Sequence, residues 1–369
     1  MKILDIKIVK SNYRPNLEAY PYTKPTDFYP EIQKTNPLEA AGYNTTSFVK
    51  MIGENGESII EVSDLVGDII LKLKNSIIGK DTDETEKIYD FLYRTTLPFG
   101  RKGIIMMAIS SIDLMLWDLK GKEMRKPVYK ILGGPTAEII PAYASHLHPT
   151  NIKELQKEAE EYLNEGYKAM KMRFCCSPID GPAGMQKNED LVKAVRDVIG
   201  YDVELMADVW MAWNLKYAKR MFQRLERYEL SWIEEPLPPD EYSAYKSLSK
   251  LGTPISAGEH AYGIQEFKLL ADSGVEILQP DALWSGGITL MKKVQGLAEA
   301  YGIQVIPHTA TAYNLHFLFS CPQYVCPMAE YLTKYRWMED FLKNPPKPKK
   351  GVFYEKEFDG YGFGIDILV

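Results

Sequence analysis

The chain has 369 residues, of which 45% are hydrophobic and 25% charged, a composition that excludes intrinsic disorder and a length that suits one large barrel with a second, smaller domain. The formal net charge of −6 and the lack of a basic run exclude a nucleic-acid binder. Neither a signal-peptide core nor an apolar stretch of about 18 residues follows the strand-like residues 1–9, so we expect a soluble cytoplasmic protein with no membrane partner.

Residues 1–134 are predicted to form an α+β domain. Residues 46–62 carry two apolar runs around Gly53-Glu-Asn-Gly56, a pattern typical of a β-hairpin. Before them, residues 13–42 are rich in Pro, Tyr and Asn without clear periodicity, and loops of that length are usually disordered or functional. Over residues 104–131 apolar positions recur at helical spacing, which predicts a long helix.

Residues 135–340 are predicted to form a β/α barrel. Apolar runs alternate with helical segments at a period of roughly 25 residues, the alternation that indicates a parallel sheet. Eight such strands close a barrel. The expected strands are 139–145, 169–174, 203–207, 230–233, 255–257, 277–279, 305–306 and 328–329. After a Pro- and Lys-rich linker, the tail within residues 341–369 is expected to pack back on the first domain.

The cysteines are predicted to be free thiols. Cys175, Cys176, Cys321 and Cys326 show no spacing typical of a zinc site. Adjacent Cys175 and Cys176 cannot readily bridge each other, and a chain of this size needs no disulfide framework.

Three acidic residues, Asp208, Glu234 and Glu259, end successive apolar runs and lie 26 and 25 residues apart. Because catalytic groups of parallel barrels sit at the carboxyl ends of the strands, we expect these side chains to converge at one mouth. Three hard oxygen ligands favour a divalent cation, above all Mg²⁺. The alternative is that each acid only caps the helix that follows it.

Short motifs extend over nearly the whole chain. They are Ser110-Ser-Ile-Asp-Leu-Met-Leu-Trp-Asp-Leu-Lys-Gly121, Leu132-Gly-Gly, Trp232-Ile-Glu-Glu-Pro236, Ser256-Ala-Gly-Glu259, Gln279-Pro-Asp281 and Ser285-Gly-Gly-Ile-Thr289. Together they resemble the mandelate racemase subgroup of the enolase superfamily. The resemblance implies an α/β fold, a modified TIM barrel (β/α)7β under an N-terminal α+β cap, in a homo-oligomer. It also implies Asp208, Glu234 and Glu259 as ligands of one Mg²⁺ per active site, with Glu235 pointing the other way.

Further motifs resemble the sugar-acid dehydratases of that subgroup, typified by L-rhamnonate dehydratase. They are Ser177-Pro-Ile-Asp-Gly-Pro-Ala-Gly184, the run from Trp232 to Pro239 with Tyr242 and Tyr245, and Gly258-Glu-His260. The resemblance implies a small acid sugar as substrate, dehydrated to its 2-keto-3-deoxy acid: L-rhamnonate, or another aldonate such as fuconate, arabinonate, xylonate or gluconate. The loop histidine of L-rhamnonate dehydratases is absent, since the five histidines stand at 146, 148, 260, 308 and 316, and this weakens rhamnonate as the substrate.

His308 and Asp281 end neighbouring predicted strands, so their side chains are expected to meet. A buried carboxylate orients an imidazole and raises its basicity. We expect His308 to remove the C2 proton, whose loss Mg²⁺ makes possible by stabilising the resulting charge, and then to protonate the departing C3 hydroxyl in a syn elimination. The alternative is a purely structural histidine.

The second predicted strand departs from the subgroup. Where relatives have Lys-x-Lys, with the second lysine as the opposing base, this chain has Lys171-Met-Arg173. An arginine is a poor base but binds carboxylates and hydroxyls well, so a racemase or epimerase of a 2-hydroxy acid becomes the second choice. Lys171 is a candidate electrophile, a candidate base or a structural cation. A muconate-type cycloisomerase is disfavoured because Asp281 stands where that chemistry has a lysine, and a catalytically inert binding protein remains the alternative from another class.

The remaining candidates would bind substrate. His260 would bind a hydroxyl, act as an acid or support its neighbours. Glu330 would donate a hydrogen bond in its protonated form, which burial among acids favours, unless it is a surface residue. The others are Arg173, Trp210 beyond Asp208, and Arg14, Tyr22, Lys24 and Tyr29 in the loop expected to cover the barrel mouth.

Overall fold

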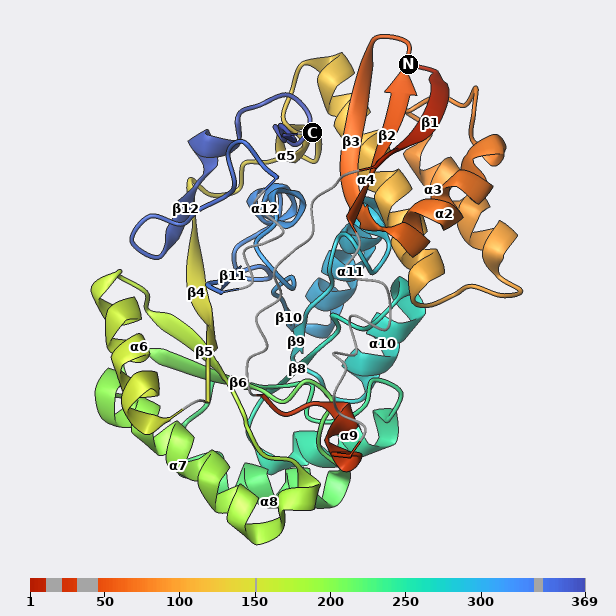
Figure 1. The fold of residues 1–369 in the computed structure, drawn as a ribbon. Coiled ribbons are helices and arrows are strands. Elements are labelled where there is room, and N and C mark those ends of the chain that lie inside the picture. Colours follow the sequence, from red (N-terminus) through yellow and green to blue (C-terminus); the bar gives the residue numbers. More distant parts are fainter. Residues whose placement is uncertain (11–21, 32–45, 150, 335–340, 369) are drawn as a thin grey trace.

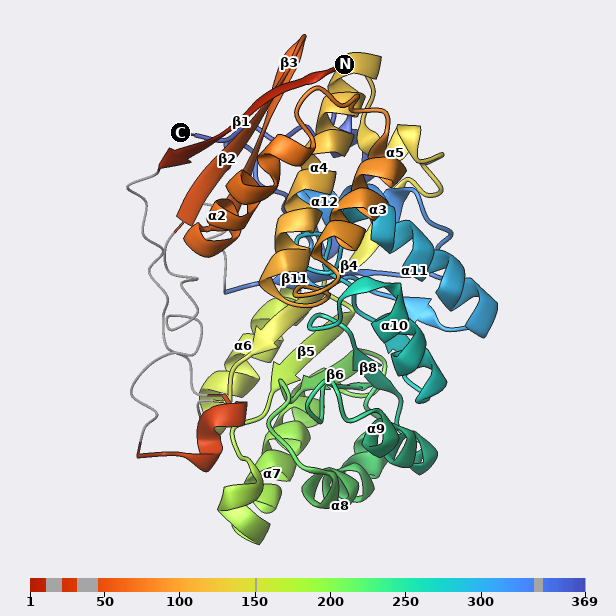
Figure 2. The same ribbon diagram turned by 90° about the vertical axis from the view of Figure 1, so that its right-hand side faces the viewer.

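The computed structural model describes residues 1–10, 22–31, 46–149, 151–334 and 341–368 (Figure 1). A small antiparallel sheet with its helices forms a cap, and a larger parallel sheet forms a barrel. Both described ends of the chain lie at the cap end of the molecule (Figure 2). No helix in the described part of the chain combines the length and apolar character of a membrane span.

The cap sheet has the order β1 (Ile3–Lys10), β2 (Thr46–Gly53), β3 (Gly56–Ser63). Gly53 pairs with Gly56, which confirms the predicted hairpin. Helices α2 (Asp64–Leu73) and α4 (Ile104–Met124) pack on this sheet, and α3 (Thr85–Thr96) lies against α4.

Helix α4 is shorter than predicted. It ends at Met124, Arg125 takes the left-handed conformation with φ 52°, and a short helix α5 follows at Val128–Ile131. Pro127 between them has no N–H for helical bonding and disfavours a helical conformation of the residue before it, so one helix over 104–131 could not form. The apolar periodicity across the break reflects packing, because α4 is buried between β3 and the barrel helix α11.

Eight parallel strands run in the order β11, β4, β5, β6, β7, β8, β9, β10, as predicted for a capped barrel. Their bounds are β4 (Ile139–Leu147), β5 (Ala169–Arg173), β6 (Glu204–Asp208), β7 (Ile233–Glu234), β8 (Ile255–Ala257), β9 (Ile277–Leu278), β10 (Gln304–Val305) and β11 (Ala329–Leu332). The outer helices are α6 (Ile152–Asn164), α7 (Gly181–Ile199), α8 (Leu215–Leu225), α9 (Tyr242–Leu248), α10 (Gly263–Asp272), α11 (Gly287–Tyr301) and α12 (Ala312–Phe319). A further strand, β12 (Val352–Tyr354), pairs antiparallel with β4.

The barrel interior below the carboxyl ends of the strands is filled by a cluster of buried residues that is separate from the main hydrophobic core. It consists of Tyr143, Ala169, Met206, Trp232, Ile277 and Ile306. Successive side chains of a strand alternate between faces, so the residues two positions further on point into the same interior, nearer the carboxyl ends. These next residues include Lys171, Asp208 and Glu234, which makes the layer above the apolar one charged.

The described residues form no ladder between β10 and β11. At this seam a side chain replaces the backbone pairing, since the Thr309 N–H donates to Oε2 of Glu330 at 3.0 Å. The carboxylate of Glu330 on β11 therefore bridges the gap between β10 and β11.

The C-terminal segment contacts the cap helices. The Val128 N–H donates to the Gly362 carbonyl at 2.9 Å, and the Phe363 N–H donates to Oδ1 of Asp118 at 3.0 Å. The four cysteines are free, as predicted, and the sulfurs of Cys175 and Cys176 lie 3.2 Å apart.

Candidate active site

Acidic side chains from neighbouring strands stand at the carboxyl end of the barrel. Asp208 and Glu234 are the last residues of β6 and β7 and pair in register, and Glu259 lies two residues beyond β8. All three are buried. The structure thus places the three predicted metal ligands on consecutive strands at one mouth, as their spacing indicated.

Lys171 on β5 lies between two of the buried acids. Its Nζ is 2.6 Å from Oε2 of Glu234 and 2.6 Å from Oε1 of Glu330, and it stands 5.7 Å from the ring centre of Tyr143. Burial alone would lower the pKa of Lys171, but the carboxylates of Glu234 and Glu330 outweigh it and raise that pKa well above its ordinary value. Lys171 is therefore a buried cation that holds opposite walls of the barrel together.

The surroundings of Glu330 oppose the protonated form that we expected. Glu330 is buried on β11, which excludes a surface role, and burial alone would raise its pKa. The charges of Lys171 and His308 and the hydrogen bond from Thr309 dominate instead and lower the pKa of Glu330 to about 2. Glu234 behaves oppositely, because burial and the neighbouring acids raise its pKa to about 8.

Arg173, two residues after Lys171 on the same strand, faces the same mouth. Its Nη2 lies 2.9 Å from Oδ2 of Asp208, and its Nε donates to Nδ1 of His146 at 3.0 Å. The guanidinium carbon stands 4.8 Å from the ring centre of Tyr22, a distance typical of a cation–π contact. The predicted loop residue Tyr22 thus reaches the site.

The donor set fits a divalent cation. Three carboxylates supply hard oxygen ligands, and Oε1 of Glu234 is fully buried with no hydrogen-bond partner among the described residues. A buried carboxylate oxygen without a partner is costly unless a cation or water satisfies it. Asp208, Glu234 and Glu259 are therefore the residues that would hold Mg²⁺.

Glu235 does not point away from the site as expected. Its Oε2 lies 2.8 Å from Nδ1 of His260, and its φ of 36° turns the chain at this point. Glu235, Glu259 and His260 form the one cluster of potential metal ligands in the described chain whose atoms lie within 4.8 Å of one another. Asp208 and Glu234 stay outside that cluster, and they pair with Arg173 and Lys171 respectively.

His308 and Asp281 meet as predicted. Nδ1 of His308 lies 2.8 Å from Oδ2 of Asp281, and its Nε2 faces Oε2 of Glu259 at 3.5 Å. The Leu283 N–H donates to the other Asp281 oxygen at 2.7 Å, which fixes the carboxylate. Burial lowers the pKa of His308, but Glu259 and Asp281 outweigh burial and raise it to about 10.

His260 forms a second imidazole–carboxylate pair with Glu235. The indole of Trp284 contacts both imidazoles, with ring centres 5.9 Å from His260 and 5.2 Å from His308. Despite burial, Glu235 and Glu259 raise the pKa of His260 to about 9. Both histidines therefore lie next to Glu259, on one side of the mouth.

The other predicted contacts divide into three groups. Trp210 binds the carboxylates, since its backbone N–H donates to Asp208 at 2.9 Å and its Nε1–H to Glu259 at 3.1 Å. Tyr29 is 60% exposed, and the Lys24 backbone N–H donates to Asp27. Arg14 lies outside the described residues.

Sequence reasoning missed four residues that the structure brings to this mouth. The Gln279 amide donates to Oε2 of Glu234 at 2.9 Å, and the others are His146, Glu235 and Trp284. Gln279 was visible as part of the Gln279-Pro-Asp281 motif, and Trp284 follows Asp281 by three residues, in a turn in which its N–H donates to the Asp281 carbonyl. No sequence signal singled out His146.

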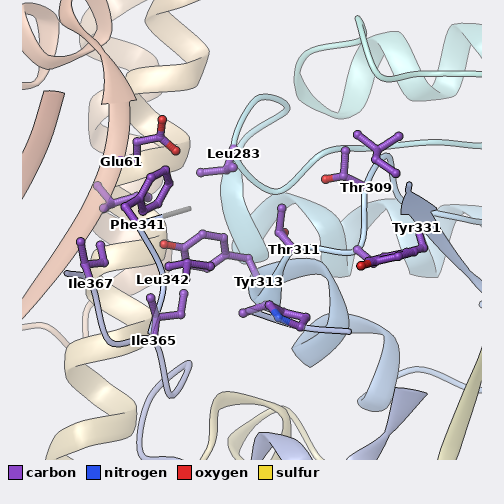
Figure 3. Close-up of a pocket in the computed structure, with 15 residues that line it drawn as sticks. Glu61, Leu283, Thr309, Thr311, Tyr313, Tyr331, Phe341, Leu342, Ile365 and Ile367 are labelled. Atoms are coloured by element: carbon purple, nitrogen blue, oxygen red, sulfur yellow. The ribbon is translucent and has the colours of Figure 1, made fainter. Parts of the chain in front are cut away.

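An apolar cavity of about 70 Å³ lies beside this mouth (Figure 3). It is lined by β3, by the segment after His308 and by the C-terminal segment, including Glu61, Thr309, Tyr313, Phe341 and Ile367. None of the candidate site residues lines it, so it is separate from the charged layer.

Most of the chain matches known protein families. Residues 154–368 match the family described as enolase C-terminal domain-like, and residues 51–133 match the mandelate racemase / muconate lactonizing enzyme N-terminal domain. A Caldivirga maquilingensis protein provisionally named L-rhamnonate dehydratase is 37% identical over 309 residues, which are 80% of this chain and 75% of that protein.

Solved structures share nearly the whole fold. Rhamnonate dehydratase from Gibberella zeae complexed with Mg has a TM-score of 0.88 at 27% identity, with 99% of this chain and 94% of that chain covered. The 3,6-anhydro-D-galactonate cycloisomerase from Zobellia galactanivorans has a TM-score of 0.80 at 27% identity, with 100% and 97% covered. The chain therefore belongs to the mandelate racemase / muconate lactonizing enzyme family of the enolase superfamily.

Proposed function

We propose that the protein is a Mg²⁺-dependent dehydratase that converts an aldonic acid to its 2-keto-3-deoxy acid. The observation that carries this proposal is the position of the His308–Asp281 pair. This pair lies on one side of the carboxylate row, which consists of Asp208, Glu234 and Glu259, and Arg173 lies on the other side. The names of relatives among the rhamnonate dehydratases support an aldonate as the substrate.

In this arrangement a base stands on one face of the substrate, and the substrate proton can be taken from that face. Asp208, Glu234 and Glu259 on β6 to β8 separate β5, which carries Arg173, from the segment after β10, which carries His308. Arginine stays protonated in proteins, so it cannot take a proton from the opposite face of the substrate. Racemisation by two opposed bases, the second candidate function, therefore lacks its second base at this position.

The imidazole of His308 can carry out both proton transfers of the reaction. Neutral His308 takes the C2 proton on Nε2, and Asp281 stabilises the resulting imidazolium. The imidazolium then gives a proton to the C3 hydroxyl, which leaves as water from the same face, and the enol tautomerises to the ketone. Mg²⁺ held by the three carboxylates would stabilise the negative charge that develops on the substrate carboxylate and would offset the Glu259 charge beside His308.

Arg173 would bind the substrate carboxylate or a hydroxyl through its planar fork. Lys171 would remain an ion-paired cation at the floor of the site, since two carboxylates contact it at 2.6 Å. His260, oriented by Glu235, would contact a substrate hydroxyl from the same side as His308.

The test is a screen of aldonates in D₂O with Mg²⁺, including L-rhamnonate, fuconate, arabinonate, xylonate and gluconate. We expect a 2-keto-3-deoxy product from at least one of them. Recovery of substrate that carries deuterium and an inverted C2, without keto acid, would instead show a racemase or epimerase. Absence of both products and of Mg²⁺ binding would indicate an inert binding protein.

A further inference from the structure

Strand β4 carries a backbone irregularity next to the site. Ser145 pairs with Lys171 and Leu147 pairs with Met172, so one extra residue, His146, is inserted on β4. His146 has a φ of 82°, which is uncommon for a residue other than glycine and strains the backbone. Such bulges occur beside active sites, where they redirect a side chain.

The bulge directs the His146 imidazole to Arg173. The imidazole is buried, and its Nδ1 accepts the Nε–H of Arg173 at 3.0 Å. An accepting Nδ1 requires the neutral tautomer protonated on Nε2. Burial and the charge of Arg173 lower the pKa of His146 well below its ordinary value, which keeps this acceptor neutral.

Three contacts from different segments then define the orientation of the guanidinium. His146 on β4 binds Nε, Asp208 on β6 binds Nη2, and the ring of Tyr22 lies against the guanidinium plane. Because the five N–H donors of arginine lie in one rigid plane, fixing Nε fixes the direction of the remaining fork.

We propose that His146 is a positioning residue that holds Arg173 in the orientation that binds the aldonate. The proposal rests on the proposed function of this site. The strained backbone of the bulge is retained because it delivers an acceptor to Nε that a regular β4 strand would turn to the other face. His146 acts through Arg173 and takes no proton from the substrate.

Two substitutions separate this role from simple space filling. His146→Asn keeps an acceptor oxygen close to the place of Nδ1, and Asn tolerates positive φ. His146→Gly also tolerates positive φ but removes the acceptor. Loss of a hydrogen bond to a charged group costs about 1.5–3 kcal/mol, so we expect His146→Gly to raise KM about 10-fold to 100-fold with kcat within about 3-fold. His146→Asn should restore KM to within about 3-fold of the wild type.

A spectroscopic readout tests the contact without any turnover. In the Mg²⁺-loaded protein, the ¹⁵Nε–H signal of Arg173, identified by its loss in Arg173→Lys, should be protected from solvent exchange. It should remain protected in His146→Asn and become rapidly exchanging in His146→Gly. An unchanged signal in a folded His146→Gly protein overturns the positioning role even if aldonates are dehydrated.

The two hypotheses fail separately. If no aldonate is turned over but the Arg173 signal responds to His146→Gly and is retained in His146→Asn, the proposed function fails and the contact stands. If His146→Gly and His146→Asn raise KM equally, His146 only fills space, and the positioning role is overturned.

Discussion

Nδ1 of His308 lies 2.8 Å from Oδ2 of Asp281, although the two residues are 27 positions apart in the chain. The contact exists because β9 and β10 are neighbours in the sheet and both residues stand just beyond the ends of their strands. It leaves Nε2 of His308 facing Glu259 and the carboxylate row.

Replacing His308 with asparagine tests its role as the acid and base. His308→Asn should reduce kcat by about 10²–10⁴, because the only imidazole held by Asp281 is lost, while Mg²⁺ and aldonate binding persist. Turnover is measured with saturating aldonate, and binding by calorimetry. Asp281→Asn is the companion variant and should lower kcat while leaving the histidine in place. A His308→Asn protein that fails to fold would show that His308 is structural.

Binding of Mg²⁺ should stabilise the fold. Chelator-treated protein should melt at a lower temperature, since a ligand at about 100 times its Kd stabilises the folded state by about 2.7 kcal/mol, a shift of several degrees. Glu234→Gln should abolish the shift. Glu204→Gln is the matched control, because Glu204 is the exposed first residue of β6 at the opposite end of that strand, and it should keep the shift. A full Mg²⁺ response in Glu234→Gln would contradict the ligand assignment.

Acid should destabilise the protein through His316. This buried imidazole accepts the Tyr129 N–H on Nδ1 at 3.2 Å and lies 3.2 Å from the Phe363 carbonyl through Nε2, so it is neutral in the fold. Burial lowers its pKa to about 3, whereas the unfolded chain has the ordinary value of about 6.5. The unfolded state therefore binds the extra proton between these values, and His316 costs about 1.4 kcal/mol of stability per pH unit as the pH falls below about 6.5.

Urea unfolding from pH 7 to pH 4 measures this dependence. His316→Gln should show a flatter fall of the unfolding free energy over that window, whatever its stability at pH 7. Equal slopes for wild type and His316→Gln would rule out a neutral buried His316.

Gly287 and Gly296 of α11 should respond oppositely to alanine. A Cβ on Gly287 would come within 2.7 Å of Cγ of Asp113 on the cap helix α4, and Gly287 has a φ of 70°. Gly287→Ala should therefore destabilise by about 3 kcal/mol. Gly296 lies in the same helix with nothing near its added Cβ, so Gly296→Ala should stabilise by about 1 kcal/mol. Thermal unfolding of both variants decides, and similar melting temperatures would contradict the close approach of α4 and α11.

Much of this fold could be predicted from the sequence. Two apolar runs around Gly53-Glu-Asn-Gly56 located the β2–β3 hairpin, and apolar runs that alternate with helical segments located the eight barrel strands. The spacing of Asp208, Glu234 and Glu259 followed from the same repeat, since one strand and one helix separate equivalent positions. The break between α4 and α5 was missed because packing periodicity continued across Pro127.

The sequence by itself determined that residues such as Asp208, Glu234 and His308, at the ends of the predicted strands, reach the mouth of the barrel. Only the tertiary structure brought His146 there and decided the partners and pKa values of these residues. Lys171 from β5 lies 2.6 Å from Glu330 and lowers its pKa, and Glu235 turns inward to His260. The bulge at His146 likewise depends on the register between β4 and β5. Strand periodicity is a local property, but hydrogen bonding and ionisation depend on distances between segments far apart in the chain, and only the closed barrel sets those distances.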